Sequence, residues 1–215
     1  TGGNVSFYNE TNGAPIPPTP MVGMVGLIER REWITRPAFQ SAGDIVVVLG
    51  DTPRGLGGSE FAAWSLGPDL PGRPLRGEGP VFDLEAEVRL QRAVRRAIRE
   101  GLLRSAHDTS EGGLAVALAE CVIASREAGL GAEIEAAPGA PLAEALFGET
   151  PPRIVASVAP HSLERLFALS QEEKIFCRDI GTVVASGGLR LLGTDLLETD
   201  RLREAFVTPP FEGLA

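Results

Sequence analysis

Residues 43–61, GDIVVVLGDTPRGLGGSEF, decide the fold class of this chain of 215 residues. The β-branched run at residues 44–50 is typical of a strand buried on both faces, and residues 61–66 indicate a helix. The glycine-rich stretch at residues 55–60 lies between them. This order of strand, glycine loop and helix can cradle a phosphate, although it matches no dinucleotide or P-loop pattern. The segment therefore predicts an α/β protein.

Apolar periodicity predicts the other elements. Residues 83–104 carry apolar side chains at helical spacing amid Glu and Arg, and residues 114–128 are apolar on nearly all sides, which indicates a central, buried helix. We expect a buried strand at residues 21–28 (MVGMVGLI) to share one sheet with residues 44–50, covered by these two helices. Further strands are predicted at residues 5–8, 132–136, 153–158, 181–185 and 189–192, and a further helix at residues 162–174.

These elements together predict a mixed α/β (α+β) fold, in which a mixed sheet is packed with helices. The proline-rich run PIPPTP at residues 15–20 is rigid and indicates a domain boundary. We therefore expect residues 1–20 to be the remnant of a preceding domain with its linker, and residues 21–215 to form one domain. The chain begins at Thr1 without a start methionine, a basic region or an apolar signal region, so we expect that further residues precede it.

Charge and hydropathy exclude several classes of function. The chain has 29 acidic and 20 basic side chains, a formal charge of -9, and its arginines are spread along acidic helices. We therefore expect no nucleic-acid partner. The apolar stretches are far shorter than the roughly 20 residues of a membrane-spanning helix, so no membrane partner is expected. Cys121 and Cys177 lie in apolar runs without metal-type spacing, and we expect two reduced core thiols in a cytoplasmic protein.

The segment GGNVS at residues 2–6 is the first candidate site. Glycine lets backbone approach a phosphate closely, and the side-chain oxygen of Asn4 suits a hard cation such as Mg²⁺. The same residues are also typical of a plain turn.

The segment HDTSEGG at residues 107–113 is the second candidate site, because it precedes an expected helix whose free N–H groups attract anions. The alternative is a helix cap alone. Asp108 or Ser110 suits the N-cap position, and Asp108 with Glu111 has the spacing of a capping box. His161 has no ligand partner at metal spacing, and we expect it at the surface. Spacing alone yields no complete catalytic arrangement.

Several motifs, taken together, resemble the large subunit of formylglycinamidine ribonucleotide synthase, also called phosphoribosylformylglycinamidine synthase, of the PurL type. They occur in the order seen in that family and run from Gly2 to about Gly148, so the resemblance covers most of the chain. The motifs are GGNVSFYNE at residues 2–10, PIPPTPMVGMVGLI at residues 15–28, GDIVVVLGDT at residues 43–52, GLGGSEF at residues 55–61 and AHDTSEGGLAVALAEC at residues 106–121.

The resemblance implies a C-terminal fragment. That family has two halves, each an A domain followed by a B domain. Residues 1–20 would be the end of the second A domain, and residues 21–215 the second B domain, which is the C-terminal domain of the aminoimidazole ribonucleotide synthetase-like superfamily. The implied reaction is a ligation in purine biosynthesis. ATP activates the amide oxygen of formylglycinamide ribonucleotide, and ammonia derived from glutamine then displaces phosphate.

The resemblance also implies site residues. In the GGNVS motif, Gly3 corresponds to an ATP contact, Asn4 to a Mg²⁺ ligand and Ser6 to a contact with the ribonucleotide. The second motif is shared more widely among relatives, and its role in this half is less defined. Its candidate phosphate-binding residues are His107, Asp108, Ser110, Gly112 and Gly113.

No catalytic residue is assigned, because the catalytic histidine of the family and most of its metal ligands belong to the first half of the subunit. Residues 148–153 (GETPPR) also depart from the pattern of the family. We therefore expect the fragment to be inactive alone. Its implied partners are the N-terminal part of the same subunit, a glutaminase subunit, a small PurS-type subunit and the small ribonucleotide substrate.

Two other interpretations stay open. The chain is then either part of another ATP-using enzyme of the same superfamily, with one A–B unit, or a non-catalytic module that holds a nucleotide and stabilises its subunit.

Overall fold

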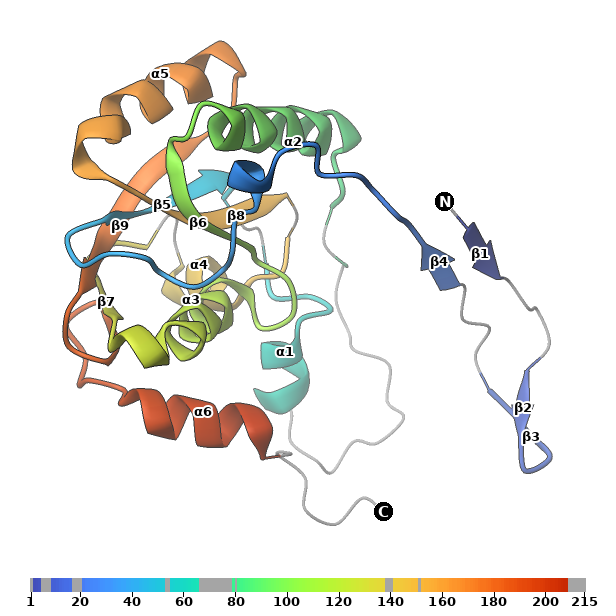
Figure 1. Cartoon of the computed structure of the whole chain (residues 1–215). Helices are drawn as coiled ribbons and strands as arrows, with labels where there is room; N and C mark the ends of the chain where they lie inside the picture. Colours follow the sequence, from blue (N-terminus) through green and yellow to red (C-terminus); the bar gives the residue numbers. More distant parts are fainter. Residues whose placement is uncertain are drawn as a thin grey trace. The chain divides into compact units, whose positions relative to one another are not determined.

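The structure is a computed structural model that describes residues 2–4, 9–16, 21–52, 55–65, 79, 81–137, 141–150 and 152–208. They divide into two compact units, residues 1–34 and residues 35–215 (Figure 1). The expected linker falls partly outside these residues, so the boundary after residue 20 stays a prediction.

The first unit consists of two small antiparallel pairs. In one pair Gly3 lies opposite Val22, and in the other Thr11 lies opposite Ala14. The strand predicted at residues 5–8 lies outside the described residues. The elements of this unit are β1 (Gly2–Asn4), β2 (Glu10–Thr11), β3 (Ala14–Pro15), β4 (Met21–Gly23) and the 3-10 helix η1 (Arg31–Trp33).

The prediction for residues 21–28 is wrong. Only Met21–Gly23 forms a strand, it pairs with β1 instead of joining the large sheet, and every residue from 21 to 28 is exposed, with Val25 at 95%. An apolar run indicates a surface that favours burial but does not specify what buries it. The sequence therefore identified the apolar character of this stretch correctly and its sheet incorrectly.

The second unit is built on one six-stranded mixed sheet with the order β10-β7-β9-β5-β8-β6. Every neighbouring pair is antiparallel except β10 and β7, which are parallel. The predicted mixed sheet is thereby confirmed. Its strands are β5 (Ile45–Gly50), β6 (Leu103–Asp108), β7 (Gly131–Ile134), β8 (Arg153–Val158), β9 (Cys177–Val184) and β10 (Gly188–Leu191).

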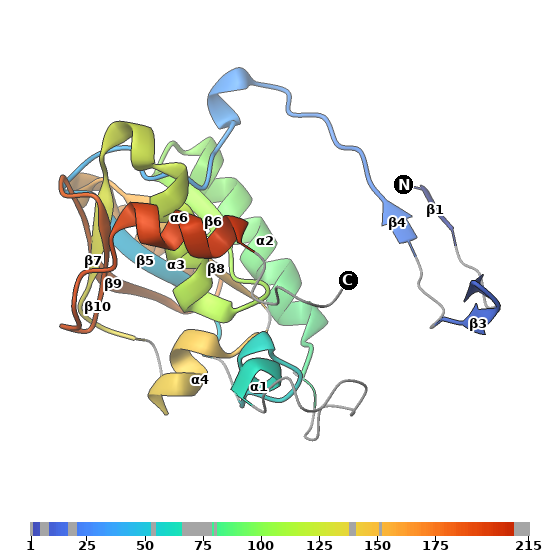
Figure 2. The same ribbon diagram turned by 90° about the horizontal axis from the view of Figure 1, so that it is seen from below.

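Helices cover both faces of this sheet. Helices α2 and α5 pack on one face and α3 on the other, with α6 beside α3 (Figures 1 and 2). The helices are α1 (Glu60–Ser65), α2 (Leu84–Arg99), α3 (Gly113–Ala124), α4 (Leu142–Phe147), α5 (Leu163–Glu172) and α6 (Thr199–Val207), with 3-10 turns η2 (Arg126–Ala128) and η3 (Pro160–Ser162).

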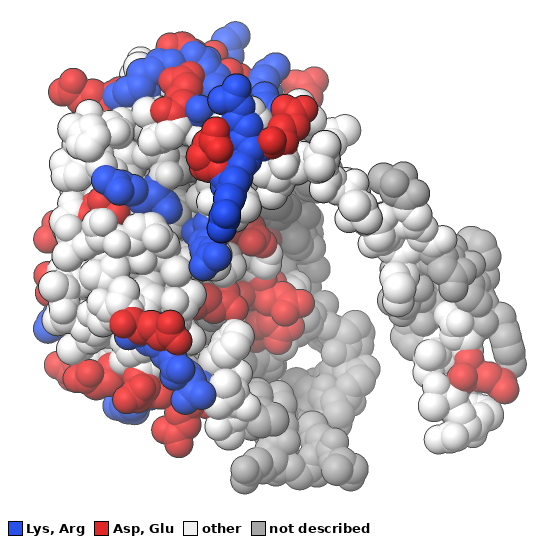
Figure 3. Space-filling view, viewed as in Figure 1, with Lys and Arg blue, Asp and Glu red and all other residues white. Residues whose placement is uncertain are grey.

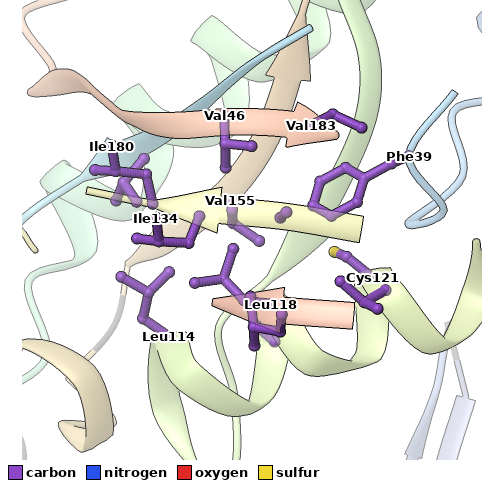
Figure 4. Close-up of a cluster of buried hydrophobic side chains, with 14 of the residues drawn as sticks. Phe39, Val46, Leu114, Leu118, Cys121, Ile134, Val155, Ile180 and Val183 are labelled. Atoms are coloured by element: carbon purple, nitrogen blue, oxygen red, sulfur yellow. The ribbon is translucent and has the colours of Figure 1, made fainter. Parts of the chain in front are cut away.

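The continuous apolar run of β5 follows from these two layers. Successive side chains of a strand point to opposite faces, so Val46 and Val48 pack with α3, and Val47 and Leu49 pack with α2 and α5. All four are at most 1% exposed. Figure 4 shows the α3 side, where Leu118 lies against the sheet. The prediction of a strand buried on both faces is confirmed.

Helix α2 begins as expected and ends earlier than predicted. Asp83 is its N-cap, and the Asp83 carboxylate accepts a hydrogen bond from the Ala86 N–H at 3.0 Å. The chain then turns through Gly101 and continues as β6, which the sequence analysis missed. Ser105 is buried in β6, and its hydroxyl bonds that of Ser157 at 2.7 Å. Because a polar serine occupies a buried position, the alternation of apolar and polar residues that identifies a strand is absent from this part of the sequence.

The outer surface of α2 and α5 is covered by interspersed Arg and Glu side chains (Figure 3). Arg96 contacts Glu172 at 2.6 Å, and Arg165 contacts Glu100 at 2.9 Å. The two helices are thus linked by paired charges of both signs. Within the described part of the chain, the helices lack the combination of length and hydropathy that a membrane span requires.

Candidate functional site

The topology of the sheet brings three loops to one edge. Strands β5 and β6 are both antiparallel to β8, which lies between them. Consequently β5 ends at Gly50 and β6 ends at Asp108 on the edge where β8 begins at Arg153. The glycine-rich loop after β5 and the loop after β6 therefore lie on either side of the segment that enters β8.

Carboxylates from the first turn of α4 and from the segment after this helix bind both of these loops. Glu149 Oε1 accepts hydrogen bonds from the backbone N–H of Glu60, at the start of α1, and of Gly112, just before α3, both at 2.8 Å. Glu144 Oε2 accepts one from the Gly55 N–H, also at 2.8 Å. The two loops that the sequence singled out separately thus form one connected region.

Arg153 holds the segment that carries Glu149. Its side chain is 3% exposed, and its guanidinium donates to the carbonyl oxygens of Ala145 at 3.0 Å and Gly148 at 2.7 Å and to Thr109 Oγ1 at 3.1 Å. These three partners are neutral oxygens, and burial lowers the pKa of the guanidinium to about 10. Arg153 is thus a buried cation whose hydrogen bonds connect the loop after β6 to the end of α4.

The start of α3 differs from the predicted cap. Its N-cap is Gly112, with φ at 79° and without a side-chain cap bond, and Asp108 is the last residue of β6. The Ser110 hydroxyl donates to the Asp108 carboxylate. The predicted capping box of Asp108 and Glu111 is therefore wrong, because the strand extends to Asp108 and the turn into the helix is made by glycine.

Both glycines of this turn have a packing role that involves no ligand. A Cβ atom on Gly113, where φ is 68°, would lie 2.8 Å from the Leu146 carbonyl oxygen, and one on Gly112 would clash with Val116. Their N–H groups are also engaged, that of Gly112 by Glu149 and that of Gly113 by the Ser110 carbonyl oxygen at 3.0 Å. Close contact between α3 and α4 accounts for Gly113, and the Val116 side chain within α3 accounts for Gly112.

The other residues of this segment lie beside them. His107 Nδ1 lies 2.7 Å from the Asp108 carbonyl oxygen, and its Nε2 lies 3.2 Å from Glu120 Oε2 on α3. The hydrogen bond from Ser110 is the main cause that lowers the pKa of Asp108, against the opposing effect of burial. His107 and Asp108 also line a shallow hollow beside Pro37. Their phosphate role stays a prediction.

The first candidate segment lies in the other unit. Gly3 is in β1, and a Cβ atom there would lie 2.7 Å from the Met21 carbonyl oxygen of β4. Strand pairing by itself therefore requires this glycine. Asn4 ends β1, while its side chain and the whole of Ser6 lie outside the described residues. The predicted roles of Gly3, Asn4 and Ser6 accordingly stay predictions.

Other sequence expectations concern isolated side chains. Cys121 and Cys177 are both free; Cys121 is buried, and Cys177 is half-buried. Burial raises the pKa of Cys121 to about 12 and that of Cys177 to about 11, so both thiols are poor nucleophiles at neutral pH. His161 is exposed in η3, as predicted. The described residues contain no cluster of three or more His, Cys, Asp and Glu side chains placed to hold a metal ion.

The family model described as AIR synthase related protein, C-terminal domain, matches residues 41–193. The chain belongs to this family. The matched range contains the six-stranded sheet and all three loops at its edge.

Curated relatives agree with this assignment. The chain is 46% identical over 192 residues to the Symbiobacterium thermophilum phosphoribosylformylglycinamidine synthase subunit PurL, and 50% identical over 162 residues to the protein of the same name from Synechococcus sp.. The first match covers 89% of this chain and 24% of the relative, and the second covers 74% and 20%. The predicted resemblance is confirmed. The chain spans about a quarter of the length of these relatives.

Solved structures support the fold. The structure of T. maritima PurL complexed with FGAR matches with a TM-score of 0.65 and 22% identity, and the match covers 80% of this chain and 30% of that chain. The structures of T. maritima PurL complexed with ATP and of Thermotoga maritima PurLQS each match with a TM-score of 0.61. Each covers 80% of this chain and 28% of that chain, at 20% and 18% identity.

Sequence reasoning missed the residues that organise the sheet edge in this member of the AIR synthase related family. Glu144, Glu149 and Arg153 bind backbone or hydroxyl groups of distant segments, and no fixed spacing along the chain marks such partners. The sequence did contain one signal for these residues. In GETPPRIVASV, Glu149 lies shortly before β8 and Arg153 begins it, and charged residues are unusual at the start of a buried strand.

Proposed function

We propose that this chain is the C-terminal part of a PurL-type large subunit. In the intact subunit it would contribute to the ATP- and glutamine-dependent conversion of formylglycinamide ribonucleotide to formylglycinamidine ribonucleotide. The observation that carries the proposal is the 46% identity to a curated PurL subunit over 89% of the chain. Since the chain spans about a quarter of that relative, the activity belongs to the longer protein.

The proposed reaction needs positioning and charge stabilisation more than a nucleophilic side chain. ATP phosphorylates the amide oxygen of the ribonucleotide, and ammonia attacks the activated carbon and displaces phosphate. A phosphoryl group in transfer spreads negative charge over its oxygens, and donors or cations fixed around it lower the barrier. This chain would supply a minority of those groups, and we assign it no catalytic residue.

The first unit would carry those groups. Gly3 would lie against ATP, the side-chain oxygen of Asn4 would bind Mg²⁺, and the Ser6 hydroxyl would contact the ribonucleotide. Magnesium would neutralise phosphate charge, and an amide oxygen is a suitable ligand for it. The described residues supply no cluster of acids for a complete magnesium shell, so most ligands would come from the rest of the subunit.

The second segment is a weaker candidate for phosphate. An anion at the Gly112 N–H would have to displace the Glu149 carboxylate. The proposal therefore rests on Gly3, Asn4 and Ser6, and we retain His107, Asp108, Ser110, Gly112 and Gly113 as secondary candidates only.

The proposed partners follow from the relatives. One similar structure is named PurLQS, which supports an assembly of the large subunit with a glutaminase subunit and a small subunit. Other similar structures are complexed with FGAR and with ATP, which supports these two ligands. We place the assembly in the cytoplasm.

The test is a reconstitution. A full-length subunit that contains this chain is combined with the glutaminase and the small subunit, and amidine formation is followed with formylglycinamide ribonucleotide, ATP and glutamine. We expect one ADP and one glutamate for each amidine. Turnover that needs ATP but accepts another substrate in place of this ribonucleotide would favour a different enzyme of the superfamily. Tight nucleotide binding without turnover would favour a non-catalytic module.

A further inference from the structure

Glu149 lies between two loops at one edge of the large sheet. The loop after β5 and the loop after β6 lie at one edge of the sheet because β5 and β6 run in the same direction on either side of β8. The first of these loops has the glycine-rich composition that can cradle a phosphate, and the second contains the secondary phosphate candidates at residues 107–113. A phosphate held by both loops would therefore depend on the spacing between them.

One carboxylate oxygen accepts a hydrogen bond from each of the two loop regions. Glu149 Oε1 accepts from Glu60 N–H in the first loop region and from Gly112 N–H in the second, both at 2.8 Å. The two N–H groups are 52 residues apart in sequence. A hydrogen bond to an ionised acceptor is about twice as strong as a neutral one, so a shared carboxylate is an effective link between two backbones.

Contacts of the neighbouring residues hold the backbone at Glu149 in place. Arg153 donates to the Gly148 carbonyl oxygen at 2.7 Å and to Thr109 Oγ1 at 3.1 Å, which ties the residue before Glu149 to the second loop. On the other side the Phe61 and Phe147 rings stack with centroids 4.6 Å apart, which ties α1 to the end of α4. These two contacts fix the backbone on the N-terminal side of Glu149, from which its carboxylate reaches the two N–H groups.

We propose that Glu149 is a positioning residue, which holds the glycine-rich loop after β5 and the loop after β6 at one fixed spacing by accepting a hydrogen bond from each. Within the described part of the chain, the Glu144 carboxylate accepts from the Gly55 N–H of the first loop and from no group of the second. The structural part of this inference stands on the contacts of this chain. Its kinetic consequence rests on the proposed function.

The structural arm of the test uses hydrogen exchange of the 215-residue chain. In Glu149→Ala we expect the Glu60 and Gly112 amides to exchange at least about tenfold faster. Glu149→Gln keeps an oxygen that accepts both bonds, so it should restore most of the protection. Glu144→Ala should release Gly55 and leave Gly112 protected, and the exposed Glu164→Ala should change none of these amides. Unchanged exchange in Glu149→Ala overturns the inference.

The kinetic arm uses the reconstituted full-length enzyme and varies ATP and the ribonucleotide separately. Because a loop out of place weakens binding, Glu149→Ala should raise KM for at least one of these two phosphate-bearing substrates about fivefold or more, with a smaller fall in kcat. Glu149→Gln should return KM to within about twofold of wild type. A lower Tm with both KM values unchanged would reduce Glu149 to a purely structural residue and overturn the proposal. An inactive wild-type enzyme would contradict the proposed function and leave the exchange result standing.

Discussion

Arg153 has an unusual position for a charged residue, since it is 3% exposed at the start of a central strand. Its three described partners are neutral oxygens, so the charge is satisfied by hydrogen bonds and not by a carboxylate. Burying a cation in this way costs free energy unless each donor is used. The guanidinium is suited to the task because its five donors lie on three nitrogens in a fixed plane, whereas the three donors of a lysine ammonium share one nitrogen.

Asp44 is the residue before β5, and its buried carboxyl group should make the free energy of unfolding depend on pH. Asp44 is 3% exposed, and one oxygen of its carboxylate, Oδ2, has no hydrogen-bond partner among the described residues. Burial raises its pKa above the ordinary value of 3.8, while Arg104, His161 and a hydrogen bond with the Ser41 backbone oppose this. A raised pKa in the folded state means that the neutral carboxyl stabilises the fold at low pH and that this contribution is lost as pH rises through the folded value.

We therefore expect Asp44→Asn to gain stability relative to wild type as pH rises from about 3.8 toward 7. Thermal unfolding of both proteins between pH 4 and pH 8 measures the difference in Tm. The exposed Asp195→Asn is the matched control and should show a constant difference. A gap between Asp44→Asn and wild type that does not change with pH would contradict the raised pKa.

The proposed Mg²⁺ role of Asn4 predicts that its substitution changes the reaction rate of the intact enzyme. In Asn4→Leu a proposed Mg²⁺ ligand is lost, and we expect at least a tenfold fall in rate, about 1.4 kcal/mol, because charge on the transferring phosphoryl group is less well stabilised. Ser6→Ala is the contrast and should instead raise KM for the ribonucleotide. Steady-state kinetics at varied Mg²⁺ measure both. Wild-type rate and Mg²⁺ dependence in Asn4→Leu would reduce the motif to a turn.

At the scale of elements, the junction of α3 and α4 depends on one glycine. Gly113 and Gly101 have nearly the same φ, 68° and 70°, but a Cβ on Gly113 meets the Leu146 carbonyl oxygen at 2.8 Å, whereas one on Gly101 meets nothing within 4 Å. We expect Gly101→Ala to cost about 1–2 kcal/mol of unfolding free energy from backbone strain alone. Gly113→Ala should cost about 1–3 kcal/mol more, because the contact must open.

Urea unfolding of the two glycine variants measures this difference directly. The shared backbone conformation makes Gly101→Ala a control for strain, so the excess in Gly113→Ala reports the packing between α3 and α4. An equal loss of unfolding free energy in the two variants would mean that α3 and α4 can move apart without a loss of stability.

The residue pattern within each element explains why some elements could be predicted from the sequence and others could not. The β-branched run of β5 and the apolar run of β8 were predicted within one residue of their observed bounds. Strand β6 was missed because its buried Ser105 depends on Ser157 of the neighbouring strand. Helix α4 was missed because six residues give too short a period to recognise.

At the scale of the whole molecule, we expect the isolated chain to show no ATP- and ammonia-dependent amidine synthesis. By the resemblance, it lacks the catalytic histidine and most metal ligands of the family. The measurement is amidine formation by the purified chain with ammonia, ATP and the ribonucleotide, and the full-length enzyme is the positive control. Turnover by the chain alone would show that the described residues hold a complete active site.

Local sequence patterns were enough to predict the fold class, most of the strands and helices of the large unit, and the family, because burial on both faces of a sheet and short glycine motifs leave local signals. The folded structure was needed to show that residues 21–28 stay outside the large sheet and that the two glycine-rich loops meet. Both depend on contacts between segments far apart in the chain, as between Glu149 and the N–H groups of Glu60 and Gly112. Periodicity records how a residue relates to its neighbours in sequence, and it holds no information about which distant backbone a carboxylate will bind.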